Sequence, residues 1–387
     1  MFSNRINSIK ISSIIKYNDI VKEREKNGIY FYKANIGSPN IDIDEAYFKA
    51  LSNYNEKKNE YSSPKGLSVL RQQVSEYYNK KNNREKYSIE DVIVTQGASD
   101  GIIKALFSIC DKNDEIIVLE PFFSDYKMYC NLAEVNMITI SEKNITYKNI
   151  KSIVNEKTKA ILFANPNNPD GNVLNKKEIS AILKIAKEKK MFVISDEVYS
   201  ELVYTNEYYS LSNYDYENIV IVDSASKKLN ACGSRIGFVI SKNENLIEKI
   251  RLINDSKISI SNVEQLAVAS LFSKFDEITK SNITIYKKRL EKMKECLEKN
   301  NIKYVNPQGG ICLLVDLPVN DSENFALWLA SKYQKDNKTL LVTSAKDFYQ
   351  SNEGKNKMRL CLTINENEIE SIVKLLCDAL KEYEVKI

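Results

Sequence analysis

The residues of this sequence that could do chemistry gather in four short segments, each directly after a run of apolar residues. An amine, a carboxylate and a guanidinium occur there as Lys227, Asp196 and Arg235. Groups of these types can bind an anion and move protons. The four segments are residues 96–100, 165–171, 196–199 and 224–237. Their repeated place after apolar runs favours one shared binding crevice.

The first two segments offer backbone and amide groups. Gly97, Ala98 and Ser99 form a small-residue turn before a helix predicted at residues 101–110. Free backbone N–H groups and the positive end of that helix dipole would therefore point at an anion. An ordinary helix start with Ser99 as its cap is the alternative. Asn168 lies in a rigid double turn and could present its amide to a ligand, although a plain surface turn has the same residue types.

The last two segments carry the charged groups. Asp196 ends a strand that we predict to be buried, where a carboxylate is costly unless it pairs with another group. A structural aspartate satisfied by backbone donors is the alternative. Ser224, Ser226 and Lys227 follow the next predicted strand, and Arg235 comes soon after them. For Lys227 the alternative is a solvated Lys-Lys turn.

The composition excludes several other catalytic classes. The 387 residues include no histidine, which rules out serine or cysteine nucleophiles activated by histidine and the common histidine metal sites. The seven cysteines form no Cys-x-x-Cys pair, which favours buried reduced thiols over a disulfide framework or a thiolate zinc site. Lysines and acids are interleaved and the net charge is only +4, so no nucleic-acid surface is predicted. Acid–base chemistry must come from Lys, Asp, Glu, Tyr or a cofactor.

Apolar runs and helical segments alternate through the middle of the chain. This pattern predicts a mainly parallel sheet with helices on both faces and a crevice at the carboxyl ends of the strands. The predicted strands are residues 92–95, 115–119, 160–164, 191–195 and 219–222. The C-terminal part predicts a smaller α+β unit, completed by residues from the N-terminal arm. Its predicted elements are helices at residues 279–300, 321–332 and 366–383 and strands near residues 310–315 and 358–362.

Length and hydropathy limit the organisation of the chain. A chain of 387 residues exceeds one typical domain. We divide it into an N-terminal arm that starts the small domain (residues 1–45), a large domain (46–285) and a C-terminal small domain (286–387). The content of 43% hydrophobic and 28% charged residues is that of an ordinary globular protein. The sequence has no run of ~18 apolar residues and no signal-peptide core, so we expect a cytoplasmic protein.

Taken together, the motifs resemble those of the class I and II aminotransferases, which are fold-type I pyridoxal-phosphate (PLP) enzymes, and among them the bacterial aspartate aminotransferases. The likeness covers nearly the whole chain and keeps both order and spacing. Three signatures carry it: Ser-x-Ser-Lys with Gly233 and Arg235, Asn-Pro-x-Asn-Pro-x-Gly at residues 165–171, and Asp-Glu-x-Tyr at residues 196–199. Further matches are residues 37–39, Tyr61, residues 66–71, 97–99, 121–126 and 359–361. The resemblance implies an α/β large domain with a mainly parallel seven-stranded sheet flanked by helices, beside a smaller α+β domain.

The resemblance also implies how the chain would hold PLP. Lys227 would bind the cofactor aldehyde as a Schiff base, for which its amine must be neutral. Asp196 would keep the pyridine nitrogen protonated, so that the ring accepts electrons from the substrate Cα. Tyr199 and Asn168 would hydrogen-bond the phenolic oxygen, and Phe123 would stack on the ring. The phosphate would lie at the 97–99 turn and be bound by Ala98, Ser99, Ser224, Ser226 and Arg235, with Gly97 as part of the cofactor site.

Substrate roles follow from the same resemblance. Arg359 would grip the substrate α-carboxylate in a bidentate pair, with Gly37 and Asn168 beside it. The freed Lys227 amine would move the proton from Cα to the cofactor, which gives a 2-oxo acid and the aminated cofactor, and a second 2-oxo acid would reverse these steps. Tyr61 would reach the phosphate of the neighbouring subunit. The expected assembly is therefore a homodimer with shared active sites.

Departures from the family pattern leave the amino donor open. Asp170 stands where threonine is usual, Cys312 follows Ile311 where an aromatic residue is common, and Asp347 precedes Phe348 where glycine is usual. A dicarboxylate donor needs a second cation, for which Lys257 is a candidate. A surface lysine is the alternative. The added acids would instead favour a basic or neutral amino donor.

Other function classes are compatible with parts of this pattern. The same fold and cofactor could serve a lyase, a decarboxylase or an oxidase acting on an amino acid. A non-catalytic PLP-binding sensor is more remote, because few residues precede the catalytic fold for a helix-turn-helix unit. A nicotinamide or nucleotide enzyme needs a Gly-x-Gly-x-x-Gly or Gly-x-x-x-x-Gly-Lys-Ser/Thr loop, and the sequence has neither. An aminotransferase with an aspartate-type donor is therefore the first hypothesis.

Overall fold

A seven-stranded sheet forms the centre of the larger part of the molecule. The computed structural model describes residues 4–7, 9, 11–55, 57–58, 60–205 and 207–384. Across the sheet the strand order is β2-β8-β7-β6-β5-β3-β4. Strands β3 to β7 pair in parallel, and β8 runs antiparallel to both β2 and β7. The prediction of a mainly parallel seven-stranded sheet is confirmed. The strands are β2 (Val92–Thr95), β3 (Glu115–Glu120), β4 (Asn136–Ser141), β5 (Thr158–Ala164), β6 (Phe192–Asp196), β7 (Ile219–Ser224) and β8 (Gly237–Ile240).

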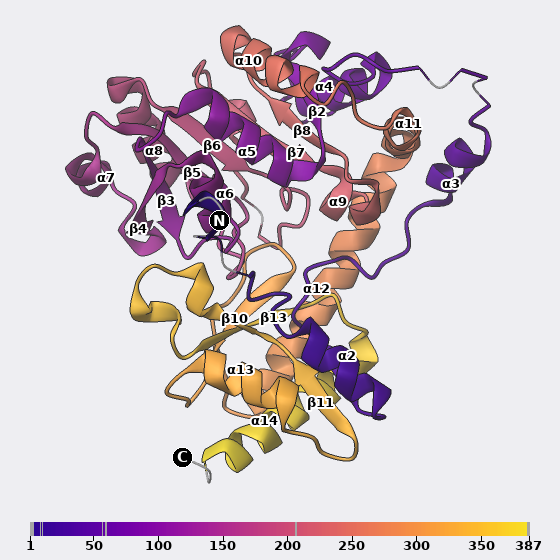
Figure 1. Ribbon diagram of the computed structural model, residues 1–387, viewed down its shortest axis with the longest axis vertical. Coiled ribbons are helices and arrows are strands. Elements are labelled where there is room, and N and C mark those ends of the chain that lie inside the picture. The colour runs from indigo at the N-terminus through magenta and orange to yellow at the C-terminus, as the bar shows by residue number, and fades with distance from the viewer. Residues whose placement is uncertain are drawn as a thin grey trace.

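Helices cover both faces of this sheet (Figure 1), because successive strand residues point to opposite sides and both sides are apolar. Val118 and Leu162 pack in the core under α5, α6 and α10, whereas their chain neighbours Ile117 and Ile161 pack in the core under α4, α8 and α11. Burial of each such side chain contributes roughly 1.5–3 kcal/mol. The helices are α4 (Ser68–Asn82), α5 (Gly97–Ile109), α6 (Tyr126–Ala133), α8 (Lys176–Lys189), α10 (Glu244–Asp255) and α11 (Asn262–Leu271).

Two helices begin earlier than the sequence pattern predicted. Helix α5 starts at Gly97 and not at residue 101, because the Asp100 carboxylate accepts a hydrogen bond from the backbone N–H of Gln96 at 2.9 Å and so caps the first turn. The turn at residues 97–99 is therefore already helical. Helix α12 spans Phe275–Lys299 and so begins before the predicted residue 279, with a buried Phe275 and two acids in its first turn.

A second unit contains a four-stranded sheet of order β12-β13-β10-β9 and a two-stranded sheet of β1 and β11. Strand β1 comes from the N-terminal part of the chain and pairs in parallel with β11. Strands β10 and β13 pair antiparallel, and their side chains form a core with those of α12, α13 and α14. The elements are α2 (Asn18–Lys26), β1 (Tyr30–Lys33), β9 (Lys303–Tyr304), β10 (Cys312–Asp316), α13 (Ser322–Ser331), β11 (Lys338–Leu341), β12 (Thr343–Ser344), β13 (Lys357–Cys361) and α14 (Ile369–Glu384).

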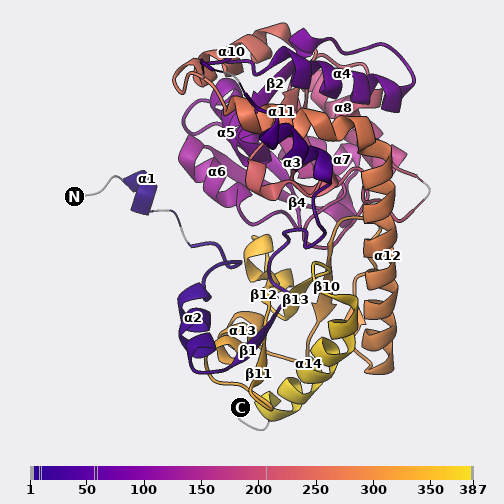
Figure 2. The ribbon, with the colours of Figure 1, turned by 90° about the vertical axis from the view of Figure 1, so that its right-hand side faces the viewer.

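Helix α12 runs along both units (Figure 2). The boundary that we placed between residues 285 and 286 falls inside this continuous helix, and the division into domains stays a prediction. The remaining helices are α1 (Asn4–Asn7), α3 (Glu45–Ser52), α7 (Tyr147–Ile153) and α9 (Ala225–Lys228). In the part of the chain that the structure describes, no helix combines the length and the apolar character needed to cross a bilayer.

Candidate active site

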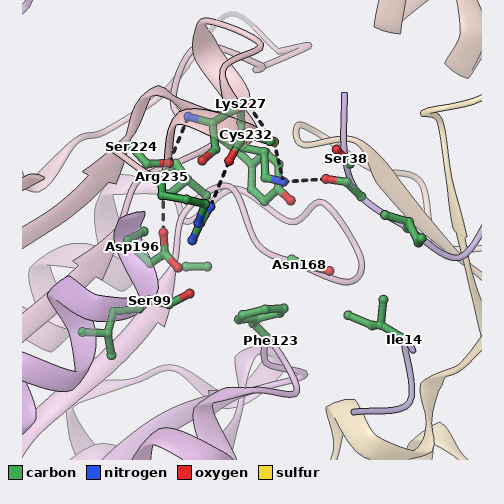
Figure 3. A pocket seen from close by; sticks show the side chains of 18 of the residues that line it. Ile14, Ser38, Ser99, Phe123, Asn168, Asp196, Ser224, Lys227, Cys232 and Arg235 are labelled. Carbon is green, nitrogen blue, oxygen red and sulfur yellow. Dashed lines mark hydrogen bonds between the residues drawn. The ribbon is translucent and has the colours of Figure 1, made fainter. Parts of the chain in front are cut away.

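The four polar segments meet at one pocket of about 330 Å³ between the two units. The carboxyl ends of β5, β6 and β7 and the first turn of α5 line the pocket, together with β13 and residues 36–38. Figure 3 shows Ser99, Asp196 and Ser224 on one side of it and Ser38 and Ile14 on the other. The predicted site residues that line it are Gly37, Ala98, Ser99, Phe123, Asn168, Asp196, Tyr199, Ser224, Ser226, Lys227, Arg235 and Arg359. Residues from segments far apart in the chain thus converge on a single cavity.

Lys227 projects into this pocket from α9, directly after β7. The Ser224 side chain accepts a hydrogen bond from the backbone N–H of Ser226 at 3.3 Å, so a helical turn begins where the strand ends. The Lys227 Nζ donates to the Gly37 carbonyl oxygen at 2.5 Å and lies 3.8 Å from the Cys232 Sγ. Figure 3 shows the amine directed toward the segment that carries Ser38. The geometry therefore favours a pocket lysine over a solvated turn.

Asp196 ends β6 and is only 6% exposed. Its Oδ2 accepts a hydrogen bond from the Tyr126 hydroxyl at 3.0 Å, and its Oδ1 accepts a longer one from the Val198 backbone N–H at 3.4 Å. Burial raises the pKa of Asp196 to about 6, although both hydrogen bonds act in the opposite direction. A buried carboxylate with so few donors is costly without a further partner. A protonated ring nitrogen would be such a partner.

The start of α5 and Arg235 would form an anion cradle, and their close packing requires glycine at two positions. Gly97 has a φ of +78°, and a Cβ there would lie 2.5 Å from the Arg235 guanidinium. A Cβ on Gly237 would lie 2.3 Å from the backbone carbon of Gly97. The first N–H groups of a helix have no acceptor within the helix, and Ala98 and Ser99 line the pocket there. These groups suit a phosphate.

Arg359 lies on β13 and is 1% exposed. Its guanidinium donates to the Asn168 Oδ1 at 3.1 Å and to the Asn35 carbonyl oxygen at 2.5 Å, and it lies 5.0 Å from the centre of the Phe348 ring. Within the described part of the chain, its Nε has no hydrogen-bond partner. A buried donor without an acceptor costs roughly 1–3 kcal/mol. A carboxylate bound in the pocket would supply the missing acceptor.

Two predicted site residues lie outside the lining of the pocket. Gly97 is covered by Arg235, which explains its absence from the lining. Tyr61 is 78% exposed on this single chain. Tyr199, by contrast, lines the pocket and is 4% exposed. The Phe123 ring, which also lines the pocket, meets the Tyr126 ring edge to face, with 5.7 Å between the ring centres.

The pocket also has an apolar part that the motifs did not predict. Ile14 and Ile36 line it, and the Ile14 carbonyl oxygen accepts a hydrogen bond from the Asn35 side chain at 2.8 Å. An isolated isoleucine gives no sequence signal, because it looks like any core residue. The contact between Tyr126 and Asp196 was also missed, although Tyr126 belongs to the matched segment at residues 121–126.

Among the residues that depart from the family pattern, Asp170 is not part of the pocket lining, whereas Ile311 and Cys312 lie next to Gly37, which is. The Asp170 carboxylate is buried in its own turn, where it accepts hydrogen bonds from the Asn167 side chain at 2.8 Å and the Asn172 backbone at 3.3 Å. Lys257 contacts Asp100 at 3.3 Å and is not part of the pocket lining. The structure therefore gives Asp170 a local structural role and leaves Lys257 apart from the substrate space.

Comparisons with known proteins agree with this geometry. The sequence model of the family "Aminotransferase class I and II" matches residues 35–376. The chain belongs to the class I and II aminotransferases. An aspartate aminotransferase of Sulfurisphaera tokodaii is 30% identical over 96% of both chains. A probable N-acetyl-LL-diaminopimelate aminotransferase of Bacillus subtilis is 26% identical over 80% of this chain and 79% of its own length.

Solved aminotransferase structures share the fold. A Thermus thermophilus aspartate aminotransferase variant superposes with a TM-score of 0.90 at 23% identity, over 98% of this chain and 99% of that one. The Thermotoga maritima aspartate aminotransferase gives a TM-score of 0.90 at 24% identity, over 98% of this chain and all of the other. The chain therefore has the fold of the fold-type I PLP enzymes, as predicted.

This aminotransferase is PLP-dependent, as its family is, and its pocket fits the cofactor. The cradle at α5 and Arg235 suits the phosphate, and the buried Asp196, which forms no ion pair with any described residue, would pair with the protonated ring nitrogen. The Lys227 amine lies in the same cavity. Its substrates are amino acids and 2-oxo acids, and its reaction is an amino transfer.

Proposed function

We propose that this aminotransferase takes its amino group from an aspartate-type L-amino acid and that Arg359, Lys227 and Asp196 carry the reaction. The observation that supports the proposal most directly is the Nε of the buried Arg359, which has no hydrogen-bond partner among the described residues and lies in the same pocket as the Lys227 amine. Several relatives are named aspartate aminotransferase.

Each residue then has a defined task in the mechanism. Arg359 binds the α-carboxylate of the amino acid and so fixes the direction of the Cα–H bond. Lys227 Nζ would take the proton from Cα and deliver it to the cofactor, and in the reverse half of the cycle it would return a proton to Cα. Asp196 holds a proton on the ring nitrogen, and Ile14 and Ile36 limit the access of water. PLP, when bound, supplies an electron sink for the Cα carbanion.

The second half of the cycle uses the same residues. Arg359 binds the carboxylate of the 2-oxo acid acceptor, and Lys227 moves a proton in the opposite direction. Phe123, Tyr199 and Asn168 line the pocket and would orient the cofactor ring. The cradle of Ala98, Ser99, Ser224, Ser226 and Arg235 would hold the phosphate throughout. The cofactor thereby stays fixed while the two substrates exchange.

A neutral amino donor is a second candidate, supported by the lining of the pocket. Among the described residues, the lining cations are Lys227, Arg235 and Arg359, all with tasks at the cofactor or the α-carboxylate. Ile14 and Ile36 offer an apolar surface instead of a second cation. Turnover of aspartate, alanine, leucine and arginine by the purified holoenzyme separates the candidates. A preference for leucine or alanine over aspartate would refute the aspartate donor.

Transamination is distinguished from the lyase alternative by a half-reaction. With a single amino acid and no 2-oxo acid, we expect the aminated cofactor to accumulate in the amount of one equivalent per active site, and the spectral change to be absent in Lys227→Ala. Release of ammonia with continuous turnover under these conditions would show elimination instead.

The proposed assembly is a homodimer in which Tyr61 completes the site of the partner subunit. The high exposure of Tyr61 on one chain supports this arrangement. Mixing unfolded Lys227→Ala and Tyr61→Ala chains and refolding them together should restore about a quarter of the wild-type activity, because half of the dimers are hybrids with one intact site. No recovery, with hybrids present by mass, would contradict shared sites. The cytoplasmic location stays a prediction.

A further inference from the structure

Two cysteines face each other across β10 and β13. Cys312 and Cys361 are partners in the antiparallel register, and their Sγ atoms are 3.0 Å apart. The next pair of opposed residues, Ile311 and Leu362, is hydrogen-bonded: the Leu362 backbone N–H donates to the Ile311 carbonyl oxygen at 2.7 Å. Cys312 and Cys361 therefore occupy a non-hydrogen-bonded position, where side chains of opposed strands come closest. The Cα separation of such pairs, about 4.5 Å, is within the range of disulfides.

The surroundings of the pair favour reaction at one of the two sulfurs. Burial would raise the pKa of Cys361, but a hydrogen bond from Cys312 and the positive charges of Arg359 and Lys227 outweigh it and lower this pKa. For Cys312, burial and the same sulfur contact raise the pKa. Because the thiolate is the reactive form of cysteine, the lowered pKa of Cys361 favours reaction within the pair.

The active-site pocket brings small molecules close to this pair. Gly37 lines the pocket, and a Cβ at that position would lie 3.9 Å from the Cys312 Sγ. Both cysteines are otherwise buried, with exposures of 4% and 0%. Because Gly37 has no side chain, the Cys312 sulfur lies close to the cavity, next to Ile311 and Tyr199. A reagent about the size of water is small enough to reach the Cys312 sulfur from the cavity.

We propose that Cys312 and Cys361 form a redox site that hydrogen peroxide or a comparably small hydroperoxide converts to a disulfide. One of the two sulfurs attacks one peroxide oxygen as a thiolate, the O–O bond breaks, and a sulfenic acid and hydroxide form. The other sulfur then attacks the sulfenic sulfur, the S–O bond breaks, and the proton of the second thiol leaves in water. Two thiols are oxidised by two electrons in total, and hydrogen peroxide is reduced to two waters.

The disulfide would act on substrate binding through the strand that carries Arg359. Arg359 and Cys361 are two residues apart on β13 and therefore point to the same face of the sheet. Closing the bond shortens the sulfur separation from 3.0 Å to about 2.05 Å and draws β10 toward β13 beside the arginine. Oxidation should accordingly change the KM of the amino donor at least two-fold, with a smaller change in kcat.

The experiment treats the PLP-loaded enzyme with hydrogen peroxide, alkylates the remaining thiols after denaturation and counts them by mass. The count should fall from seven to five, a digest should join the peptides of residues 312 and 361, and dithiothreitol should restore all seven. Cys312→Ser and Cys361→Ser each have six thiols and cannot form this disulfide. Each variant should keep all six thiols or have one of them oxidised only as far as the sulfenic acid. The control Cys296→Ser, on α12, should still lose two thiols.

Three outcomes would overturn parts of the proposal. Seven free thiols after treatment, or a bond between other cysteines in the digest, would refute the redox site. Since both readouts use the wild-type chain, they hold even if a serine variant fails to fold. An unchanged KM after complete disulfide formation would refute the link to Arg359. None of these readouts depends on which amino donor the enzyme uses.

Discussion

The buried Asp196 should destabilise the cofactor-free protein, and Asp196→Asn tests this directly. Burial raises the pKa of Asp196 from its ordinary 3.8 to about 6. A folded-state pKa above the unfolded one means that the unfolded chain ionises more easily, so folding loses stability as the pH rises through this window. The difference of about 2 pH units corresponds to about 3 kcal/mol above pH 6.

Asparagine cannot ionise, but its amide oxygen can still accept the hydrogen bond from Tyr126. We therefore expect apo Asp196→Asn to be more stable than the apo wild type by up to about 3 kcal/mol at pH 8, with the difference disappearing near pH 4. Urea unfolding of both apo proteins between pH 4 and pH 8, followed by tryptophan fluorescence, measures the difference. The chain has a single tryptophan, Trp328, so circular dichroism of the whole chain should be recorded in parallel.

The same variant should lose catalysis, because its side chain cannot keep the ring nitrogen charged. A holoenzyme that is nearly inactive, combined with a more stable apoenzyme, would show that the carboxylate is kept for chemistry and not for folding. If Asp196→Asn were no more stable than wild type at pH 8, or if the difference did not shrink on acidification, the assigned burial cost would be wrong.

Three further predictions address other parts of the site. Arg359→Ala should lower kcat/KM by roughly 10²-fold, equivalent to about 3 kcal/mol of lost carboxylate binding, while the absorbance of the bound cofactor stays unchanged. Gly237→Ala should weaken PLP binding in a fluorescence titration, because its Cβ would lie 2.3 Å from the backbone at the start of α5, whereas Gly233→Ala, with open space around it, should bind normally. Lys228→Met should lower the free energy of unfolding by about 3–5 kcal/mol, because it leaves the buried Asp223 carboxylate without its cation, and adding Asp223→Asn should recover part of that loss.

The sequence by itself determined the element types and the local placement of the reactive groups. The alternation of Val and Ile runs with helical segments predicted the sheet and its two helical layers, because apolar periodicity follows from local backbone geometry. Lys227, Asp196 and Arg235 could be placed at strand ends for the same reason. The start of α5 was missed by four residues, although the cap from Asp100 to the Gln96 backbone N–H is a local contact.

Only the tertiary structure decided which distant groups meet. Tyr126 and Asp196 are 70 residues apart, and Arg359 and Asn168 are 191 apart, yet both pairs are hydrogen-bonded. Cys312 and Cys361 carry no spacing signal over 49 residues and become neighbours through the register of β10 and β13. Such pairings depend on the summed packing of whole sheets, in which a one-residue slip would turn every side chain to the other face.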